Sequence, residues 1–352
     1  HSLLSVVTRN TFLIYIKYDI IIFYINFRGV VDVEKFKPEL FAVLKNYSKD
    51  QLQKDITAGI IVAIIALPLS IALGLASGVT PSMGIYTAII AGFLVALLGG
   101  SKVQIAGPTA AFATIVAKKK KKNGVEGLML ATIMAGVLLI IMRLLQFANL
   151  LKYIPYTITP GFTAGIAVTL LIGQLKDFTG IAFPQGVAPI SALAKLTALT
   201  AYGASLNLQA VLIGVISLAI LILWPKINAK IPGSLIAVIV AAALVKFLGL
   251  QVNTIGSLFT ISNELPHFTF NFQAINLASI HALFPDALTI AVLAGIESLL
   301  SAVVADSMIQ SRHRSNTELI AQGIANIGSA CFGGIPATGA IARTAANIKN
   351  GG

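Results

Sequence analysis

Charged residues are scarce in this sequence. Asp, Glu, Lys and Arg together make up 11% of its 352 residues, whereas soluble domains carry roughly 25%. Hydrophobic residues make up 57% of the chain, and several apolar runs reach about 20 residues, the length that a helix needs to cross a bilayer. The shortage of charge therefore excludes a soluble globular protein and indicates a polytopic membrane protein.

Cysteine and histidine are also rare. The single cysteine, Cys331, permits no intrachain disulfide, and the four histidines show no ligand spacing. No nucleophile–base pair, metal cluster or phosphate loop is visible, so we expect no enzyme, no metal site and no cofactor. The net charge is +12, but the basic residues stand singly between apolar runs. That pattern favours loop topology over nucleic-acid binding.

The chain divides into five expected parts. Residues 1–34 form an ill-defined N-terminal extension, and residues 35–54 form a cytoplasmic amphipathic segment. Residues 55–250 carry a first repeat of seven spans, residues 251–284 an extracellular loop, and residues 285–352 three further spans. The expected full spans are residues 56–76, 82–98, 125–145, 159–175, 208–224, 232–250, 285–305 and 317–332.

Two stretches are too short to cross a bilayer and resemble one another. IAGPTAAF from Ile105 and IPATGAIA from Ile335 each lead from an extended piece into a half-length helix. Such bare backbone must line protein or a water-filled cavity. Each stretch follows a long span and a second span, and the odd number of spans between the two copies inverts the second. Inverted repeats with paired broken helices place a binding site at the midplane.

One arginine, Arg343, stands one turn inside the second half-helix. A helix N-terminus presents unpaired N–H groups and a partial positive charge, so a cation there suits an anion pocket. The alternative is an anchor at the membrane surface. Thr109, at the start of the first half-helix, is either an ordinary helix cap or an anion contact.

One carboxylate, Glu297, lies close to mid-bilayer in the span over residues 285–305. A charge there costs roughly 2.5–3.5 kcal/mol, so it usually faces a cavity or a partner. Ser301 shares its helix face, and the alternative is a structural carboxyl satisfied by serine hydroxyls. A carboxylate beside an anion pocket repels the anion unless a proton or a cation neutralises it. Glu297 therefore predicts coupling to H⁺ or Na⁺, whereas Asp306 is expected to face a loop.

The basic residues predict the orientation of the chain. With a cytoplasmic N-terminus, the positive-inside rule places most of them on the inner face. These inner residues are Lys102, Arg143, Lys152, Lys226, Lys230, Arg312 and Arg314. Residues 118–122, five consecutive lysines expected to form a solvated loop, are the exception on the outer face. We expect a multi-pass protein of the cell (inner) membrane.

Three segments resemble the SulP sulfate permeases. ALPLSIALGLASGVTPSMGIYTAIIAGFLVALLGGSKVQIAGPTAAF (residues 66–112) closely resembles the signature region of that family, and GIESLLSAVVAD and PATGAIARTAANIKNGG resemble its eighth and tenth spans. The similarity covers residues 36–352. It implies an all-α polytopic transporter fold of two inverted repeats of seven spans, with core and gate domains. Relative to that fold the sequence is truncated after span 10, with spans 11–14 and the STAS domain absent.

The resemblance also implies a site and an activity. The anion would lie between the N-termini of spans 3 and 10, against Leu69, Ser70, Leu73, Thr109, Ala110, Ala342 and Arg343, with Glu297 and Ser301 as the coupling pair. Glu rather than Asp at the coupling position resembles proton symport, here of sulfate. The alternatives are a bicarbonate or dicarboxylate symporter of the same fold, a nucleobase-type permease, a passive anion channel and a non-transporting fragment. A homodimer is left open.

Overall fold

The computed structural model describes residues 36–147, 158–184, 186–187, 189–228, 231–259, 264–270 and 276–352. The extension expected over residues 1–34 lies outside these ranges, as do Lys152 and Lys230. All elements below belong to one compact unit, residues 37–352.

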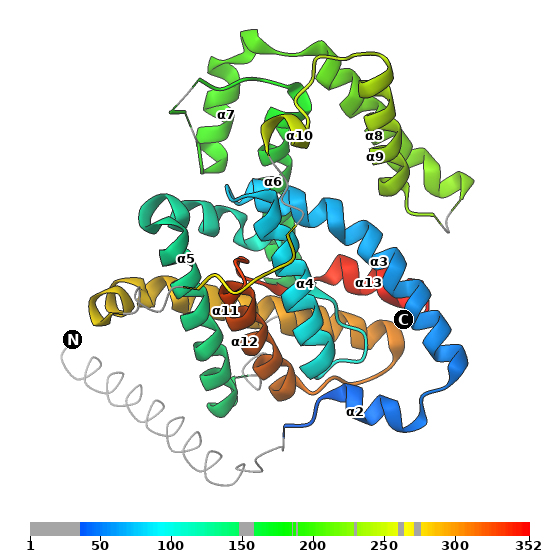
Figure 1. The fold of residues 1–352 in the computed structure, drawn as a ribbon, viewed down its shortest axis with the longest axis vertical. Helices are drawn as coiled ribbons and strands as arrows, with labels where there is room; N and C mark the ends of the chain where they lie inside the picture. The colour runs from blue at the N-terminus through cyan, green and yellow to red at the C-terminus, as the bar shows by residue number, and fades with distance from the viewer. Residues whose placement is uncertain are drawn as a thin grey trace, which may run out of the picture. The chain divides into compact units, whose positions relative to one another are not determined.

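The described part of this unit is mainly helical (Figure 1). Its helices are α2 (Glu39–Val43), α3 (Lys49–Ala76), α4 (Pro81–Leu98), α5 (Ala113–Leu144), α6 (Ile158–Thr179), α7 (Ala192–Ala201), α8 (Leu208–Ile227), α9 (Gly233–Phe247), α10 (Ile255–Leu258), α11 (Leu277–Ile309), α12 (Ser315–Cys331) and α13 (Ile341–Lys349). Short 3-10 turns include η2 (Ala110–Phe112), and the strands are β1 (Ala106–Gly107) and β2 (Thr338–Gly339).

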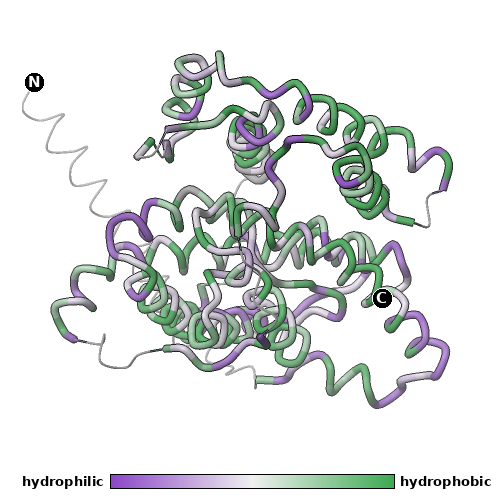
Figure 2. Tube along the Cα trace, turned by 45° about the horizontal axis from the view of Figure 1, so that its top comes forward, coloured by the Kyte–Doolittle hydropathy of each residue, from purple (hydrophilic) through white to green (hydrophobic). Residues whose placement is uncertain are grey.

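Five of the described helices are long and apolar enough to cross a membrane: α3, α4, α5, α8 and α11. Hydrophobic residues run along most of their length (Figure 2), which confirms the expected membrane protein. One predicted span is shorter than expected, since α9 has 15 residues where residues 232–250 were expected, whereas α12, with 17 residues, agrees with the span expected over residues 317–332. Protein surrounds α12, which packs against α4 and α5. Its polar side chains are therefore kept away from lipid.

Two predicted helix boundaries at prolines are wrong. Pro225 was expected to end a span, yet α8 continues to Ile227. Pro285 was expected to begin one, yet α11 begins at Leu277, so the preceding loop is shorter than predicted. The Asn276 side chain accepts a hydrogen bond from the Ser279 N–H at 2.7 Å and caps this earlier start. In both helices the proline lies inside the helix. Membrane helices tolerate this because neighbouring helices and side chains satisfy the backbone groups that the proline leaves unpaired.

The prediction of a solvated loop over residues 118–122 is also wrong. These lysines are helical, and they form the last turns of a helix that meets the rest of α5 at Gly124, where φ is 70°. Lys119 forms an ion pair with Asp286 of α11, and Lys120 donates to the carbonyl of Gly78. Cations at a helix C-terminus are favourable. Part of the unexpected charge is thus compensated within the protein.

Loops predicted to share one membrane face do meet. The Arg314 N–H donates to the Gly100 carbonyl at 2.9 Å, and its guanidinium contacts the Lys37 carbonyl at 2.8 Å and Glu39 at 3.3 Å. These contacts involve residues that precede α3 in the chain, whereas the lysine run contacts Gly78, just after the last residue of α3. The 28 residues of α3 make a helix about 42 Å long, which separates the two groups of contacts. The grouping agrees with the orientation expected from the basic residues. Which face is cytoplasmic stays a prediction.

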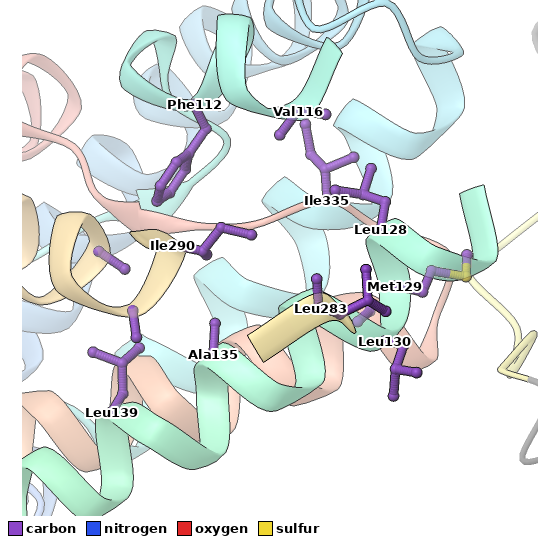
Figure 3. Close-up of a cluster of buried hydrophobic side chains, with 14 of the residues drawn as sticks. Phe112, Val116, Leu128, Met129, Leu130, Ala135, Leu139, Leu283, Ile290 and Ile335 are labelled. Carbon is purple, nitrogen blue, oxygen red and sulfur yellow. The ribbon is translucent and has the colours of Figure 1, made fainter. Parts of the chain in front are cut away.

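The apolar core lies between α5, α11 and the stretch after α12 (Figure 3). Phe112, Leu128, Leu139, Ile290 and Ile335 are all at most 1% exposed. They come from segments that are far apart in the sequence. A separate apolar cluster packs Ala106 of β1 against Ala91 and Val95 of α4 and Ala325 of α12.

Gly84 controls the approach of α4 to α3. A Cβ on Gly84 would overlap the carbonyl oxygen of Ser70, whereas a Cβ on Gly59 of α3 meets nothing within 4 Å. Overpacking against backbone costs about 1–3 kcal/mol, and alanine is favoured over glycine in a helix by about 1 kcal/mol. We therefore expect Gly84→Ala to lower the thermal unfolding midpoint in detergent and Gly59→Ala to leave it equal or higher. Equal midpoints for both variants would contradict the close contact.

Candidate anion site

A two-stranded ladder joins the two half-helix entries. Ala106 of β1 lies opposite Gly339 of β2, and Gly107 lies opposite Thr338, in antiparallel register. Beyond the ladder, the Ala340 N–H donates to the Ile105 carbonyl at 2.8 Å. The two stretches that resemble each other in the sequence therefore lie side by side. The order α3–α4–β1–η2 is also repeated as α11–α12–β2–α13, and the inverted relation of the copies stays a prediction.

Both helix starts follow this ladder directly. Pro108 and Thr109 separate β1 from η2, and Ala340 separates β2 from α13. The unpaired N–H groups of both first turns thus lie close to the strands, where an anion would find donors. The strands themselves are covered by α4, which contacts β1, and by α11, which contacts β2. This agrees with the rule that such backbone lines protein or a cavity at membrane depth.

Arg343 crosses from α13 to β1. It is 2% exposed, and its Nη2 donates to the Pro108 carbonyl at 2.5 Å. Its guanidinium lies against Gly107, where any Cβ would overlap Nη1. Nε and Nη1 are buried and find no hydrogen-bond partner in the described part of the chain. The surface-anchor alternative is therefore wrong, and two donors of a buried cation are left for another acceptor.

Glu297 meets the same cluster from α11. The Thr109 hydroxyl donates a hydrogen bond to its Oε2 at 3.1 Å. The Thr338 side chain also hydrogen-bonds to this carboxylate, and the positive charge of Arg343 attracts it. Thr109 makes no side-chain cap bond at η2. The helix-cap alternative for Thr109 is thus not borne out, because its hydroxyl serves the carboxylate instead.

The serines near Glu297 have separate surroundings. The Ser298 hydroxyl accepts a hydrogen bond from the Gly339 N–H at 3.0 Å. Ser301, one turn past Glu297, is 1% exposed, and its hydroxyl has no partner among the described residues. The hydroxyls that act on Glu297 are therefore those of Thr109 and Thr338, not the serine hydroxyls of α11 considered above. Ser301 keeps a free oxygen beside the cluster.

The predicted residues of α3 contribute less directly. Ser70 and Leu73 are buried and Leu69 is half-buried, and α3 packs against α13, α4 and α5. The Ser70 hydroxyl has no hydrogen-bond partner in the described chain. Of the two predicted alanines, Ala110 is half-buried and Ala342 is exposed. The structure thus joins Thr109 to Glu297 by a hydrogen bond and Arg343 to the carbonyl of the adjacent Pro108, whereas the α3 residues are linked to α13 by helix packing.

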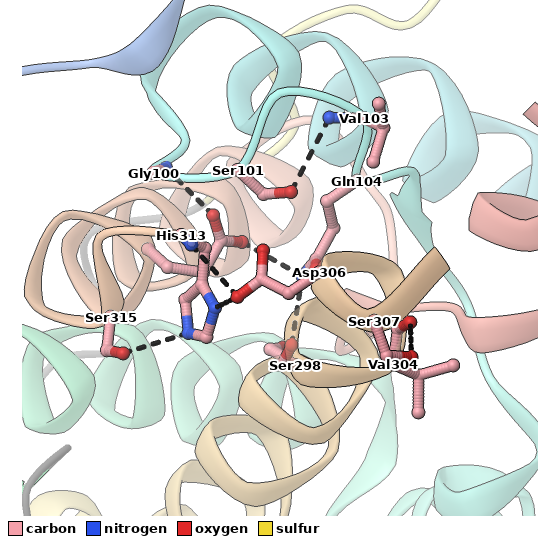
Figure 4. A network of polar contacts seen from close by, with 11 residues as sticks. Gly100, Ser101, Val103, Gln104, Ser298, Val304, Asp306, Ser307, His313 and Ser315 are labelled. Atoms are coloured by element: carbon pink, nitrogen blue, oxygen red, sulfur yellow. Dashed lines mark hydrogen bonds and ion pairs between the residues drawn. The ribbon is translucent and has the colours of Figure 1, made fainter. Parts of the chain in front are cut away.

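Several supporting side chains were not expected from the sequence. Thr344 accepts a hydrogen bond from the Ile105 N–H at 3.0 Å, and Ser298 holds Gly339. Asp306 faces the loop after α11, as expected, and its carboxylate lies 2.7 Å from Nδ1 of His313 in that loop (Figure 4). The signal in the sequence is weak: each is a single polar residue in an apolar run, and its partner lies far along the chain or across a turn.

The profile of the sulfate permease family matches residues 52–352. The chain belongs to the sulfate permease family. It is 43% identical over 309 residues to "Putative sulfate transporter YvdB" of Bacillus subtilis (strain 168), covering 87% of this chain and 58% of that protein. It is 33% identical over 324 residues to the bicarbonate transporter BicA of Picosynechococcus sp. (strain ATCC 27264 / PCC 7002 / PR-6), covering 86% and 54%. The chain thus spans somewhat more than half the length of these relatives.

Solved structures of the permease fold agree. The transmembrane domain of a cyanobacterial BicA superposes with a TM-score of 0.75 at 30% identity, covering 86% of this chain and 77% of that one. Murine Slc26a9 in the inward-facing state superposes with a TM-score of 0.78 at 18% identity, covering 92% and 58%, and at that identity it supports the fold alone. The expected all-α permease fold is therefore confirmed.

Proposed function

We propose that this permease is a secondary active transporter of sulfate that works by proton symport. The observation that carries this function is the buried Arg343, whose Nε and Nη1 have no partner in the described chain beside the first turns of two helices. Family membership supports an anion as the substrate, and the name of the 43% identical relative supports sulfate.

The anion would lie between η2 and α13. There it would accept hydrogen bonds from Nε and Nη1 of Arg343 and from the first-turn N–H groups of both helices. A planar guanidinium offers two parallel donors to an oxyanion, which a lysine does not. Burial strengthens these interactions because little water competes for the donors.

Coupling would come from Glu297. Without an anion, the negative charge of its carboxylate favours the positive charge of Arg343, although the two groups form no ion pair within 4 Å. An incoming anion competes for that positive charge, so binding is favoured when Glu297 loses its own charge. A proton needs only the carboxyl oxygen itself, which makes proton symport the simplest assignment. Alternating access about a fixed midplane site would then carry both across together.

Sodium-coupled bicarbonate transport is the second candidate. It is favoured by the 30% identical BicA transmembrane domain and its coverage of 86% of this chain. The unpartnered Ser301 hydroxyl, one turn past Glu297, would supply a further oxygen ligand for a cation. The two candidates share the anion site and differ in the coupling ion.

Uptake by the purified protein in liposomes separates these candidates. We expect saturable uptake of labelled sulfate that is accelerated by an inward proton gradient and unaffected by sodium, with bicarbonate and fumarate taken up more slowly. Sodium-dependent bicarbonate uptake would replace the first candidate by the second. Flux that neither saturates nor couples to a gradient, with single-channel currents, would show a channel and contradict both.

A further inference from the structure

A fully buried carboxylate lies behind the strand ladder. Glu318, the fourth residue of α12, is 0% exposed. Its Oε2 accepts a hydrogen bond from the Gly100 N–H at 2.9 Å. Its Oε1 accepts from Gln104 Nε2 at 3.0 Å and from Gln322 Nε2 at 2.9 Å. All three partners are donors, so the geometry suits an ionised carboxylate that holds each of them in place.

Gln104 connects Glu318 to the strand ladder. It is 4% exposed, and one residue, Ile105, separates it from β1. Its Nε2 also donates to the Ser298 carbonyl at 3.1 Å, and the Ser298 hydroxyl binds the Gly339 N–H. Figure 4 shows the Gln104 side chain extending toward Ser298. Glu318 is therefore connected through one amide to α11, at the residue next to Glu297, and to β2.

The contact between Gln104 and Gly339 is very close. A Cβ on Gly339 would overlap the Gln104 amide, so the amide packs directly on the β2 backbone. A shift of Gln104 would therefore move β1 against β2. Because Gly107 ends that strand and Pro108 follows it directly, the same shift would move the Pro108 carbonyl that Arg343 contacts.

We propose that Glu318 is a positioning residue for the anion site. Its carboxylate fixes Gly100 and Gln104, which hold β1 in register with β2 and so keep Pro108 and Gly107 against Arg343. This role rests on the proposed function, since it takes Arg343 as the anion contact. Glu318 itself does not touch the anion; it acts through Gln104 and the ladder.

Glu318→Gln tests this role with almost no change in volume. The new side chain keeps one acceptor for the Gly100 N–H, but its own NH₂ group meets the donors of Gln104 and Gln322. The oxygens of both amides have no partner in the described chain, so these amides turn until their oxygens accept from the new NH₂ group. Turning Gln104 removes its bond to Ser298. We expect the KM for sulfate uptake to rise about tenfold, because losing this hydrogen bond should lower the affinity of the site for sulfate by about that factor.

The maximal rate per folded protein should stay within about twofold, because the loss weakens anion binding rather than the step that follows. A merely structural Glu318 would behave differently. It would lower the yield and the unfolding midpoint and leave the KM of the remaining folded protein unchanged, which would overturn the positioning role.

Two further variants keep the test decisive. Glu126→Gln removes an exposed carboxylate of α5 and is the matched control, expected to keep the wild-type KM. Gln104→Met keeps the volume and leaves Glu318 its bonds to Gly100 and Gln322. It should raise the KM as much as Glu318→Gln, and it decides the matter if Glu318→Gln does not fold.

Arg343→Ala in the same assay separates this role from the function beneath it. A wild-type KM in Arg343→Ala contradicts the proposed anion site. Loss of uptake in Arg343→Ala together with a wild-type KM in both Glu318→Gln and Gln104→Met contradicts the positioning role alone.

Discussion

Arg343→Ala is expected to abolish sulfate binding and uptake. Arg343 is 2% exposed, and its Nε and Nη1 are buried without a partner in the described residues. Hydrogen bonds to charged groups contribute about 1.5–3 kcal/mol each. Losing two of them, and the charge, would lower the affinity by at least about 100-fold. Binding of labelled sulfate to the purified protein, with uptake into liposomes, measures this loss.

The controls separate charge from geometry. Arg343→Lys keeps the positive charge without the planar fork, so we expect binding between that of the wild type and of Arg343→Ala. Arg312→Ala removes an exposed arginine of the loop after α11 and should keep the wild-type affinity. Sulfate should raise the unfolding midpoint of the wild type and of Arg312→Ala but not that of Arg343→Ala. Wild-type affinity in Arg343→Ala would remove this residue from the site.

The central features of the site were predictable from local pattern. The entries at Ile105 and Ile335 share Pro, Gly and Thr after a short extended piece, and they do pair as β1 and β2. A lone charge in an apolar run is costly enough to demand a partner, which is why Glu297 and Arg343 could be selected without a structure. The fold followed from the same runs and from the family resemblance.

Roles set by distant partners were not predictable. Thr109 reads equally well as a helix cap, and only the approach of Glu297, 188 residues away, gives its hydroxyl another partner. The role of Glu318 could not be predicted for the same reason, because its partners Gly100 and Gln104 are more than 200 residues away in the sequence. A sequence shows that such a residue is polar but not what it contacts.

The prediction of a loop over the five lysines, residues 118–122, was wrong for a different reason. Five like charges suggest solvent, yet lysine is a good helix former, and the favourable C-terminal end of a helix accepts cations. The compensating carboxylate, Asp286, lies on α11. Helix propensity and a remote partner together outweighed the repulsion that the loop prediction assumed.

Glu297→Gln is expected to separate anion binding from proton coupling. The glutamine has the shape of a protonated glutamate, and its amide oxygen still accepts from the Thr109 hydroxyl that now contacts Oε2. Arg343 loses its negative partner and stays available to the anion. Sulfate affinity should therefore be kept or improved, and it should no longer depend on pH, whereas wild-type affinity should fall as rising pH leaves Glu297 charged.

The largest effect should be on concentrative uptake. With the membrane potential clamped at zero, a gradient of one pH unit can drive about tenfold accumulation per proton, which the wild type should approach. In Glu297→Gln the internal sulfate should rise only to the external concentration, while exchange of sulfate for sulfate continues. Glu126→Gln, which removes an exposed carboxylate, should accumulate sulfate as the wild type does. Accumulation by Glu297→Gln under the same gradient would show that the coupling proton binds elsewhere, because the amide at this position cannot carry it.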